Sequence, residues 1–284
     1  MSKIIVITGA SGGLGASLAI VAAKAGHRVY ATMRDVGKRA TLDRAAMTAK
    51  VEIPVLALDV ADAASVNAAV AEVIAREGRI DVLVNNAGAG FARATEQASL
   101  EDIAGIMDVN FMGVVRTTKA VLPHMRATRS GHIVNISSVG GLVGQPFNEV
   151  YCASKFALEG YTESLACYVQ PRFNVRFTLI EPGGIQSDFA AAAMRQIAAT
   201  GGLLQDEYLP ILQAYMARAK ERGASAYQTP DEVAAVVMSC VDSSDPPVRL
   251  RTSPWAESLC ELKTRADPDG RAMQRHVMET FLGS

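Results

Sequence analysis

The sequence predicts an α/β fold, a single doubly wound domain of about seven parallel strands with helices on both faces. Short apolar runs rich in β-branched residues, the first of them Ile4 to Thr8, alternate with longer stretches of helical periodicity. A glycine-rich stretch, Gly9 to Gly15, directly follows that first run, as expected where a strand turns sharply into a helix. With 284 residues, 49% of them hydrophobic, the chain can bury one large core.

The strands are predicted at the short apolar runs. They are Ile4 to Thr8, Arg28 to Met33, Val55 to Leu58, Ile80 to Val84, His132 to Ser137, Val175 to Ile180 and Pro246 to Leu250. Because most of these runs are apolar without interruption, they are typical of strands buried on both faces of a parallel sheet.

The helices are predicted from their periodicity and their end signals. They extend from the glycine-rich stretch to Ala25, then over 62–77, 100–125, 151–169 and 231–241, with a helical remainder up to Ser284. Asp62 is the expected N-cap and Gly78 the expected end of the second helix. Thr229 and Glu232 have the spacing of a capping box, with proline at the first helical position.

Charge and composition exclude several classes of function. The formal net charge is −1, so nothing favours binding to nucleic acid. The chain opens directly into its first strand without a signal peptide, and it contains no apolar run long enough to span a bilayer. We therefore expect a cytoplasmic protein with a small-molecule partner and no membrane or nucleic-acid partner.

The cysteines and histidines do not form a metal-binding pattern. The four cysteines match neither a zinc spacing nor Cys-x-x-Cys, and the four histidines are scattered. These residues are Cys152, Cys167, Cys240, Cys260, His27, His124, His132 and His276. We expect buried free thiols and no metal.

Tyr151 and Lys155 are four positions apart in a helical pattern, so both side chains should leave one face of one helix. A positive charge ~4 Å from a phenol is worth roughly 4 kcal/mol at an effective dielectric of ~20. If the pair is close and desolvated, this lowers the pKa of the phenol from about 10 toward ~7, where it can exchange protons. Ser138, at the carboxyl end of a predicted strand, is the natural second hydrogen bond to a substrate oxygen.

These motifs together resemble the short-chain dehydrogenase/reductase family. The resemblance rests on Thr8-Gly9-x-x-x-Gly13-x-Gly15, Asn85 to Gly88, Asn110, Ser138, Tyr151-x-x-x-Lys155 and Pro182-Gly183, and it covers roughly residues 3–190. Within the family, residues 146–160 most resemble the 17β-hydroxysteroid dehydrogenase and ketoreductase branch. The resemblance implies a Rossmann fold and hydride transfer between a nicotinamide cofactor and a secondary alcohol or ketone.

The resemblance also assigns roles to individual residues. It implies that Tyr151 exchanges the proton and that Lys155 depresses the pKa of Tyr151 and holds the nicotinamide ribose. It further implies that Asn110 holds a water that relays protons from the lysine to solvent. The cofactor-binding residues that it implies are Gly9, Ser11, Gly13, Leu14, Gly15, Arg34, Asp59, Val60, Asn86, Ala87, Gly88, Tyr151, Lys155, Pro182, Gly183, Ile185 and Ser187.

The choice between NADP(H) and NAD(H) depends on the end of the second strand. A carboxylate there binds the ribose hydroxyls of NAD, whereas a guanidinium binds the 2′-phosphate of NADP. The family comparison places the discriminating position at Met33, followed by Arg34, which favours NADP(H). The alternative is that Arg34 is a solvated residue and Asp35 binds the ribose.

The segment of about 187–225 is predicted to be a helical substrate lid, broken by Gly201-Gly202 and Pro210. Ser187 stands where the family usually has threonine, which leaves carboxamide binding as an expectation but puts its rigidity in doubt. The apolar lining of the lid is Phe189, Met194, Leu203, Leu204, Tyr208, Leu212 and Tyr215, most of which could simply pack on the domain.

The sequence therefore predicts an NADP-dependent oxidoreductase acting on a hydrophobic ketone or secondary alcohol. Two alternatives remain open, a 3-oxoacyl-thioester reductase and a non-catalytic NADP-sensing regulatory protein. By analogy with the family, in which the helices over 100–125 and 151–169 pair subunits, a homodimer or homotetramer is expected.

Overall fold

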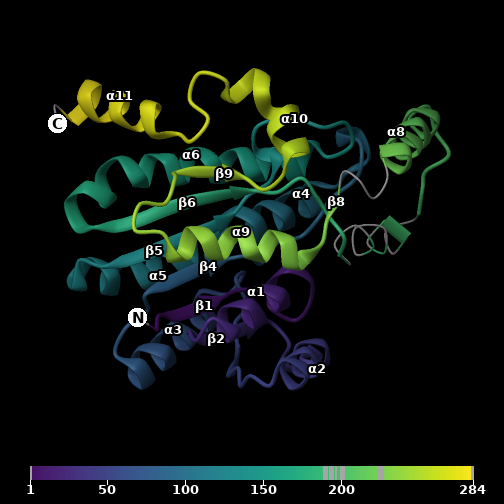
Figure 1. Cartoon of the computed structure of the whole chain (residues 1–284). Coiled ribbons are helices and arrows are strands. Elements are labelled where there is room, and N and C mark those ends of the chain that lie inside the picture. The colour runs from purple at the N-terminus through teal and green to yellow at the C-terminus, as the bar shows by residue number, and fades with distance from the viewer. Residues whose placement is uncertain are drawn as a thin grey trace.

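The computed structural model describes residues 2–187, 191, 195, 197–198, 202–222 and 227–282. Seven parallel strands form one sheet in the order β3-β2-β1-β4-β5-β6-β9 (Figure 1). The strands are β1 (Ile4–Ile7), β2 (Arg28–Met33), β3 (Val55–Ala57), β4 (Val82–Asn85), β5 (Gly131–Ile136), β6 (Val175–Glu181) and β9 (Arg249–Arg251). The strand order reverses between β1 and β4, and in doubly wound sheets such a reversal opens a crevice at the carboxyl ends of the strands. The predicted fold is confirmed.

Helices cover both faces of the sheet. One face carries α1 (Gly13–Lys24), α2 (Ala40–Ala49) and α9 (Pro230–Asp242), and the other carries α3 (Ala63–Glu77), α5 (Gly113–Thr128) and α6 (Glu149–Phe173). Along β1 the side chains alternate between the faces, since Ile5 and Ile7 join the first cluster and Ile4 and Val6 join the second. Burial on both faces explains why the strands read as continuous apolar runs.

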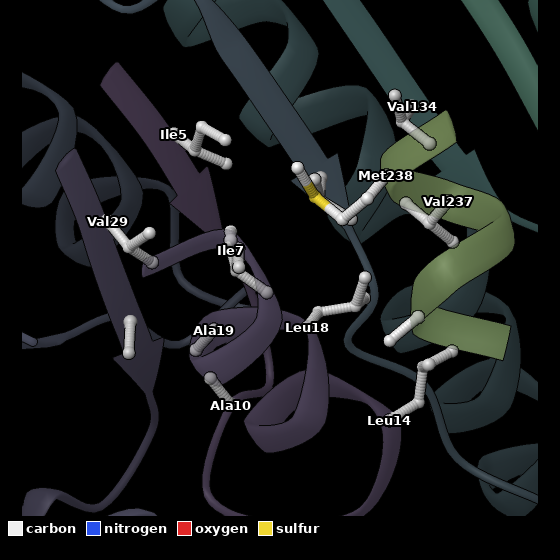
Figure 2. Packing of buried hydrophobic residues seen from close by; sticks show 14 of the residues in the cluster. Ile5, Ile7, Ala10, Leu14, Leu18, Ala19, Val29, Val134, Val237 and Met238 are labelled. Carbon is white, nitrogen blue, oxygen red and sulfur yellow. The ribbon is translucent and has the colours of Figure 1, made fainter. Parts of the chain in front are cut away.

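The first cluster fixes the helix that begins at the glycine-rich stretch. Figure 2 shows Ile5 and Ile7 of β1 beside Leu18 of α1, with Val237 and Met238 of α9 next to them. All five side chains are at most 7% exposed. Since burying an aliphatic side chain contributes roughly 1.5–3 kcal/mol, this packing holds the amino end of α1 in a set position relative to β1.

The predicted end signals of the helices are present. The Asp62 carboxylate accepts a hydrogen bond from the backbone N–H of Ala64, and Gly78 ends α3 with a φ of 75°. Thr229 and Glu232 form the capping box of α9 with both of its hydrogen bonds. All four cysteines are buried and free, as predicted.

Two local predictions differ from the structure, and one helix was not predicted. The helix predicted over 100–125 is interrupted: α4 (Leu100–Met107) and α5 are separated by a π-helical turn, Asp108–Met112. Pro210 does not break a helix, because it lies in the first turn of α8 (Leu209–Arg222), where its missing N–H has no intrahelical partner to lose. Helix α2, whose amphipathic pattern places only Leu42 in the core, was not predicted.

The carboxyl-terminal part adds peripheral elements. A small parallel sheet pairs β7 (Gly184–Ile185) with β8 (Tyr227–Gln228), and α10 (Pro254–Thr264) and α11 (Arg271–Leu282) follow β9. In Figure 1, α8 lies beyond the carboxyl ends of the strands. Within the described ranges, none of the helices is long and apolar enough to cross a membrane.

Candidate active site

The carboxyl ends of neighbouring strands bring most of the predicted site residues to one edge of the sheet. Thr8 follows β1, Asn86 follows β4, Ser138 follows β5 and Pro182 follows β6. The loops are tied to one another, since the N–H of Val139 donates to the carbonyl of Pro182 at 2.9 Å. Parallel pairing thus gathers residues that are up to 174 positions apart in the sequence.

The glycine loop between β1 and α1 packs against the loop after β4. A Cβ added to Gly9 would lie 2.7 Å from the Cα of Ala87, and a Cβ on Gly15 would lie 2.6 Å from the Nδ2 of Asn86. Gly9 also has a φ of 68°, which side chains rarely adopt. Only glycine therefore allows this close approach. Leu14 is buried in the core at the start of α1, whereas Ser11 is half-buried in the loop.

Thr8 and Asn86 join the two loops. The Thr8 hydroxyl accepts hydrogen bonds from the backbone N–H groups of Asn86 and Ala87, both at 3.0 Å. The Asn86 side chain donates in return to the carbonyls of Thr8 and Gly9 at 2.9 and 3.1 Å. Thr8 was used only as part of a motif in the sequence, and its position beside the first glycine was the available signal for this role.

Asn110 lies in the π-helical turn and is fully buried. Its Oδ1 accepts from the N–H of Ala89 at 2.7 Å, and its Nδ2 donates to the carbonyl of Ala89 at 2.9 Å and to the Ser154 hydroxyl at 3.1 Å. A Cβ on Gly88 would lie 3.4 Å from the Oδ1 of Asn110 and 3.9 Å from the Nζ of Lys155. Asn110, Gly88 and Lys155 therefore meet at one point.

Tyr151, Ser138 and Lys155 converge at the start of α6. The Tyr151 ring and the Ser138 hydroxyl both lie beside Gly140, because a Cβ there would be 3.3 Å from the Tyr151 ring and 3.4 Å from the Oγ of Ser138. The Ser138 hydroxyl also accepts from the N–H of Gly140 at 3.0 Å. The Lys155 Nζ lies 5.8 Å from the centroid of the Tyr151 ring and donates to the carbonyl of Ile136 at 2.8 Å. Since Lys155 is 6% and Ser138 9% exposed, the cluster is shielded from solvent.

The predicted fall in the pKa of Tyr151 is wrong for this arrangement. Burial raises the pKa of Tyr151 to about 12, although the hydrogen bond from Ser138 opposes the rise. Burial also lowers the pKa of Lys155 to about 8, with Glu159 acting in the opposite direction. The expectation neglected desolvation, which penalises the charged form of both groups. Near neutral pH the site therefore holds a neutral tyrosine beside a lysine that is mostly charged.

The end of β2 presents a cation rather than a carboxylate. Met33 is buried, and Arg34 is exposed at the edge of the sheet. The Asp35 carboxylate accepts a 2.9 Å hydrogen bond from the N–H of Gly37 and caps the following turn. Within the described part of the chain, Arg34 takes part in no ion pair, so its guanidinium is available to an anion.

The other predicted cofactor residues line the same edge. Asp59 caps its own turn through Ala61, and the carbonyl of Val60 accepts from Arg116 at 3.1 Å. Ser187 lies beside the glycine loop, since a Cβ on Gly13 would be 3.5 Å from the Cβ of Ser187. Ile185, which comes two residues before Ser187, pairs with Gln228 of β8.

Trp255 of α10 was not predicted as part of this region. A Cβ on Gly183 would lie 2.7 Å from the Trp255 ring, which also packs with Val139 and Leu142 near Ser138. A single tryptophan far along the chain gives no local signal of this contact.

The lid residues divide into three groups. Leu203, Leu204 and Leu212 line a pocket with the segment from Ala92 to Gln97. Tyr215 of α8 packs on Phe147 with ring centroids 6.0 Å apart and receives a 3.2 Å hydrogen bond from Asn148. Tyr208 bonds to Glu96. Phe189, Met194 and Gly201 lie outside the described residues.

Curated relatives match nearly the whole chain. Retinol dehydrogenase 8 of Bos taurus is 39% identical over 274 residues, covering 94% of this chain and 86% of that protein. The 3-ketodihydrosphingosine reductase of Bacteroides thetaiotaomicron is 36% identical over 283 residues, covering 98% and 97%. The 17-beta-hydroxysteroid dehydrogenase type 1 of Mus musculus is 38% identical over 275 residues, covering 94% and 78%.

Solved structures superpose on the whole fold. A short-chain dehydrogenase from Streptomyces avermitilis matches with a TM-score of 0.78 and 30% identity, covering 100% of this chain and 99% of that one. Actinorhodin polyketide ketoreductase with NADPH has a TM-score of 0.76 at 28% identity, covering 91% and 97%. A short-chain dehydrogenase/reductase from Burkholderia phymatum in complex with NAD has a TM-score of 0.78 at 26% identity, covering 93% of each chain.

The family model described as short chain dehydrogenase matches residues 3–198, which is most of the chain. This span contains the glycine loop, Asn110, Ser138 and the Tyr151 and Lys155 pair, and the relatives named above match beyond it. The chain is an oxidoreductase that belongs to the short-chain dehydrogenase family.

Proposed function

We propose that this protein transfers a hydride reversibly between NADP(H) and a hydrophobic ketone or secondary alcohol. The observation that carries the proposal is the placement of Tyr151 and Ser138 side by side at Gly140, at the carboxyl edge of the sheet and beside the buried Lys155. Two hydroxyl donors at one point can bind a carbonyl oxygen and stabilise the negative charge that develops on it. Tyr151, Ser138, Lys155 and Asn110 are the catalytic residues of the proposal.

The protonation states favour Tyr151 as a proton donor. With its pKa raised to about 12, Tyr151 is a neutral acid at pH 7 and can protonate the substrate oxygen as an alkoxide forms. Lys155, with its pKa lowered to about 8, is mostly a cation at pH 7 and stabilises the phenolate that Tyr151 becomes. Asn110 fixes the loop beside Lys155, where a water held by its neighbours can return the proton.

The glycine loop fits a dinucleotide cofactor. Because Gly9 and Gly15 have no Cβ, this loop can lie tight against Asn86 and Ala87, where a Cβ would collide. The first N–H groups of α1 have no partners within the helix, which suits a pyrophosphate. When bound, the nicotinamide supplies or accepts the hydride. The holding residues in this proposal are Gly9, Ser11, Gly13, Leu14, Gly15, Arg34, Asp59, Val60, Asn86, Ala87, Gly88, Tyr151, Lys155, Pro182, Gly183, Ile185 and Ser187.

The exposed Arg34 supports NADP(H) over NAD(H). A guanidinium can bind a 2′-phosphate through two parallel hydrogen bonds. Asp35, the competing candidate for the ribose, already accepts a hydrogen bond from the N–H of Gly37. Lys38 follows within the same turn and adds positive charge, whereas Arg39 is paired with Asp43 at 2.8 Å.

The segment of about 187–225 is the proposed substrate lid of a single domain spanning residues 1–284. Its leucines line a small pocket that Arg93 and Gln97 also line, and Tyr215 reaches the loop that precedes Tyr151. Relatives named for a retinol, a ketodihydrosphingosine and a hydroxysteroid support an alcohol or ketone with a large apolar part.

The test is NADPH oxidation measured on steroid ketones, aryl ketones and 3-oxoacyl thioesters, with NADH in parallel. The proposal expects turnover on a free hydrophobic ketone and a preference for NADPH. Turnover on thioesters alone would identify a 3-oxoacyl-thioester reductase. Tight NADPH binding without turnover on any compound would identify a sensor instead.

We also propose that the protein is a homodimer or homotetramer. The exposed side chains of Met112, Phe156 and Tyr168, which are 41%, 42% and 49% exposed, support this, because they lie on the segments expected to pair subunits. Light scattering after size-exclusion chromatography measures the mass of the assembly, and a monomer at micromolar concentration would contradict the proposal.

A further inference from the structure

Two carboxyl groups are buried in contact with each other behind the candidate active site. Glu159 of α6 is 5% exposed, and Glu181, the last residue of β6, is fully buried. Each carboxyl group has one buried oxygen without a hydrogen-bond partner among the described residues, and each group shifts the pKa of the other. An ionised carboxylate is only an acceptor, so two ionised carboxylates cannot satisfy these oxygens. One proton on the pair would let the two groups bond to each other.

The charged groups around the pair indicate which of the two carboxyl groups carries the proton. The guanidinium of Arg251, at the end of β9, contacts Glu181 at 3.0 Å and also pairs with Glu257 of α10. The Oε2 of Glu159 and the Oε1 of Glu181 have no hydrogen-bond partner among the described residues. A proton on the Oε2 of Glu159, donated to the Oε1 of Glu181, satisfies both atoms and leaves the anion beside Arg251.

The other groups that face Glu159 agree with this placement. Burial and the negative charge of Glu181 raise the pKa of Glu159 well above its ordinary value, and Glu163 on the next turn of α6 adds to the rise. Burial also raises the pKa of Glu181, but Arg251 opposes that rise. Lys155 lies one turn before Glu159 on the same helix. The Cys260 thiol of α10 also lies near the two carboxyl groups.

Glu159 contacts the backbone segment that carries Ser138. Its Oε1 accepts a hydrogen bond from the Ser137 hydroxyl, and a Cβ on Gly141 would lie 2.9 Å from that same oxygen. The preceding residue, Ile136, accepts through its carbonyl from Lys155. Helix α6 therefore holds Ile136 and Ser137 through side chains one turn apart, and these two residues set the position of Ser138 relative to Tyr151.

We propose that Glu159 is a positioning residue, which shares one proton with Glu181 and in that state fixes Ser137 and the adjoining catalytic Ser138. This inference rests on the proposed function where it concerns catalysis. Loss of the shared proton puts two carboxylates in direct contact, and their repulsion releases the Ser137 segment. The pair thus sets an upper pH limit for the correct geometry of the site.

Kinetics of three variants test the positioning role. Glu159→Ala removes the contact with Ser137, and a displacement of catalytic groups of this kind costs about 10- to 100-fold in kcat. Glu159→Gln restores most of kcat, because its amide donates to Glu181 and its oxygen accepts from Ser137, as the protonated acid does. Glu163→Gln, on the next turn and paired with Arg249 at the periphery, is the matched control and keeps the wild-type kcat. Equal kcat in Glu159→Ala and Glu163→Gln overturns the positioning role.

A second readout needs neither cofactor nor substrate. Since the folded protein keeps on Glu159 a proton that the unfolded chain releases, the free energy of unfolding falls as pH rises from the unfolded pKa through the folded pKa. Glu159→Gln loses most of this slope, whereas Glu163→Gln loses only the smaller share that its own burial-raised pKa contributes. Parallel profiles for the wild type and Glu159→Gln overturn proton sharing. If no ketone is reduced, the proposed function fails, but this unfolding experiment still decides whether the proton is shared.

Discussion

The Nζ of Lys155 lies 5.8 Å from the centroid of the Tyr151 ring, and Lys155 is buried whereas Tyr151 is half-buried. At this separation the cation stabilises a phenolate, but burial acts on both groups and dominates their pKa values. Near neutral pH the stable state is a neutral tyrosine beside a charged lysine. That state is ready to donate a proton to an alkoxide, so the arrangement favours the reduction of a carbonyl.

Replacing Tyr151 with phenylalanine removes the proton donor and leaves the ring in place. We expect kcat for ketone reduction to fall by about 10²- to 10⁴-fold, the usual contribution of a positioned acid. The affinity for NADPH, measured by fluorescence titration, should change little. Retained turnover in Tyr151→Phe would show that another group protonates the substrate.

The lowered pKa of Lys155 predicts a pH limit for reduction. Below about 8 the side chain is charged, and above this value it loses the proton that stabilises a developing phenolate. The rate of ketone reduction should therefore be highest below pH 8 and fall as pH rises through that value, by up to about tenfold per pH unit. Tyr151, with a pKa of about 12, stays protonated over this range.

The measurement is kcat/KM for ketone reduction from pH 6 to pH 10, with NADPH affinity at each pH as the control. In Lys155→Met the fall in kcat/KM near pH 8 should disappear, and the rate should be low at every pH. An unchanged limb in Lys155→Met would assign it to a different group.

Arg34 predicts the cofactor preference. Removing a charged hydrogen-bonding partner costs about 1.5–3 kcal/mol, so Arg34→Ala should raise the KM for NADPH by about 10- to 100-fold. The KM for NADH, which lacks the 2′-phosphate, should stay within about twofold. Arg44, an exposed arginine of α2, supplies the matched control variant Arg44→Ala. Equal losses for both cofactors would mean that Arg34 does not contact the phosphate.

The sequence was sufficient for the sheet because strands buried on both faces leave continuous apolar runs, as at Ile4 to Ile7. It was not sufficient where tertiary packing overrides a local pattern. The helical periodicity of 100–125 continues through Asp108 to Met112, yet Asn110 there bonds to Ala89 and Ser154, and the turn widens to a π-helix.

The electrostatics of the site could not be predicted from the sequence either. The four-residue spacing of Tyr151 and Lys155 predicted their proximity but carried no information on how far the site is desolvated. Glu159 and Glu181 are 22 positions apart on different elements, so only the fold brings their carboxyl groups into contact. Burial of charged groups depends on elements distant in the chain, and no local pattern reports it.

Replacing Asn110 with leucine should lower both the stability of the protein and its activity. In Asn110→Leu the partly buried N–H of Ala89 loses its acceptor and the buried Ser154 hydroxyl loses a donor. A buried polar group left unsatisfied costs about 1–3 kcal/mol, so we expect the free energy of unfolding to fall by roughly that amount, as urea denaturation can measure. Because the loop with Gly88 adjoins Lys155, the rate of reduction should also fall. In Asn110→Asp, at a pH where the carboxyl is protonated, one oxygen still accepts from Ala89, but the single O–H replaces only one of the two donations of the amide. Its losses should therefore lie between those of the wild type and Asn110→Leu. Full stability in Asn110→Leu would mean that the π-helical turn does not depend on this side chain.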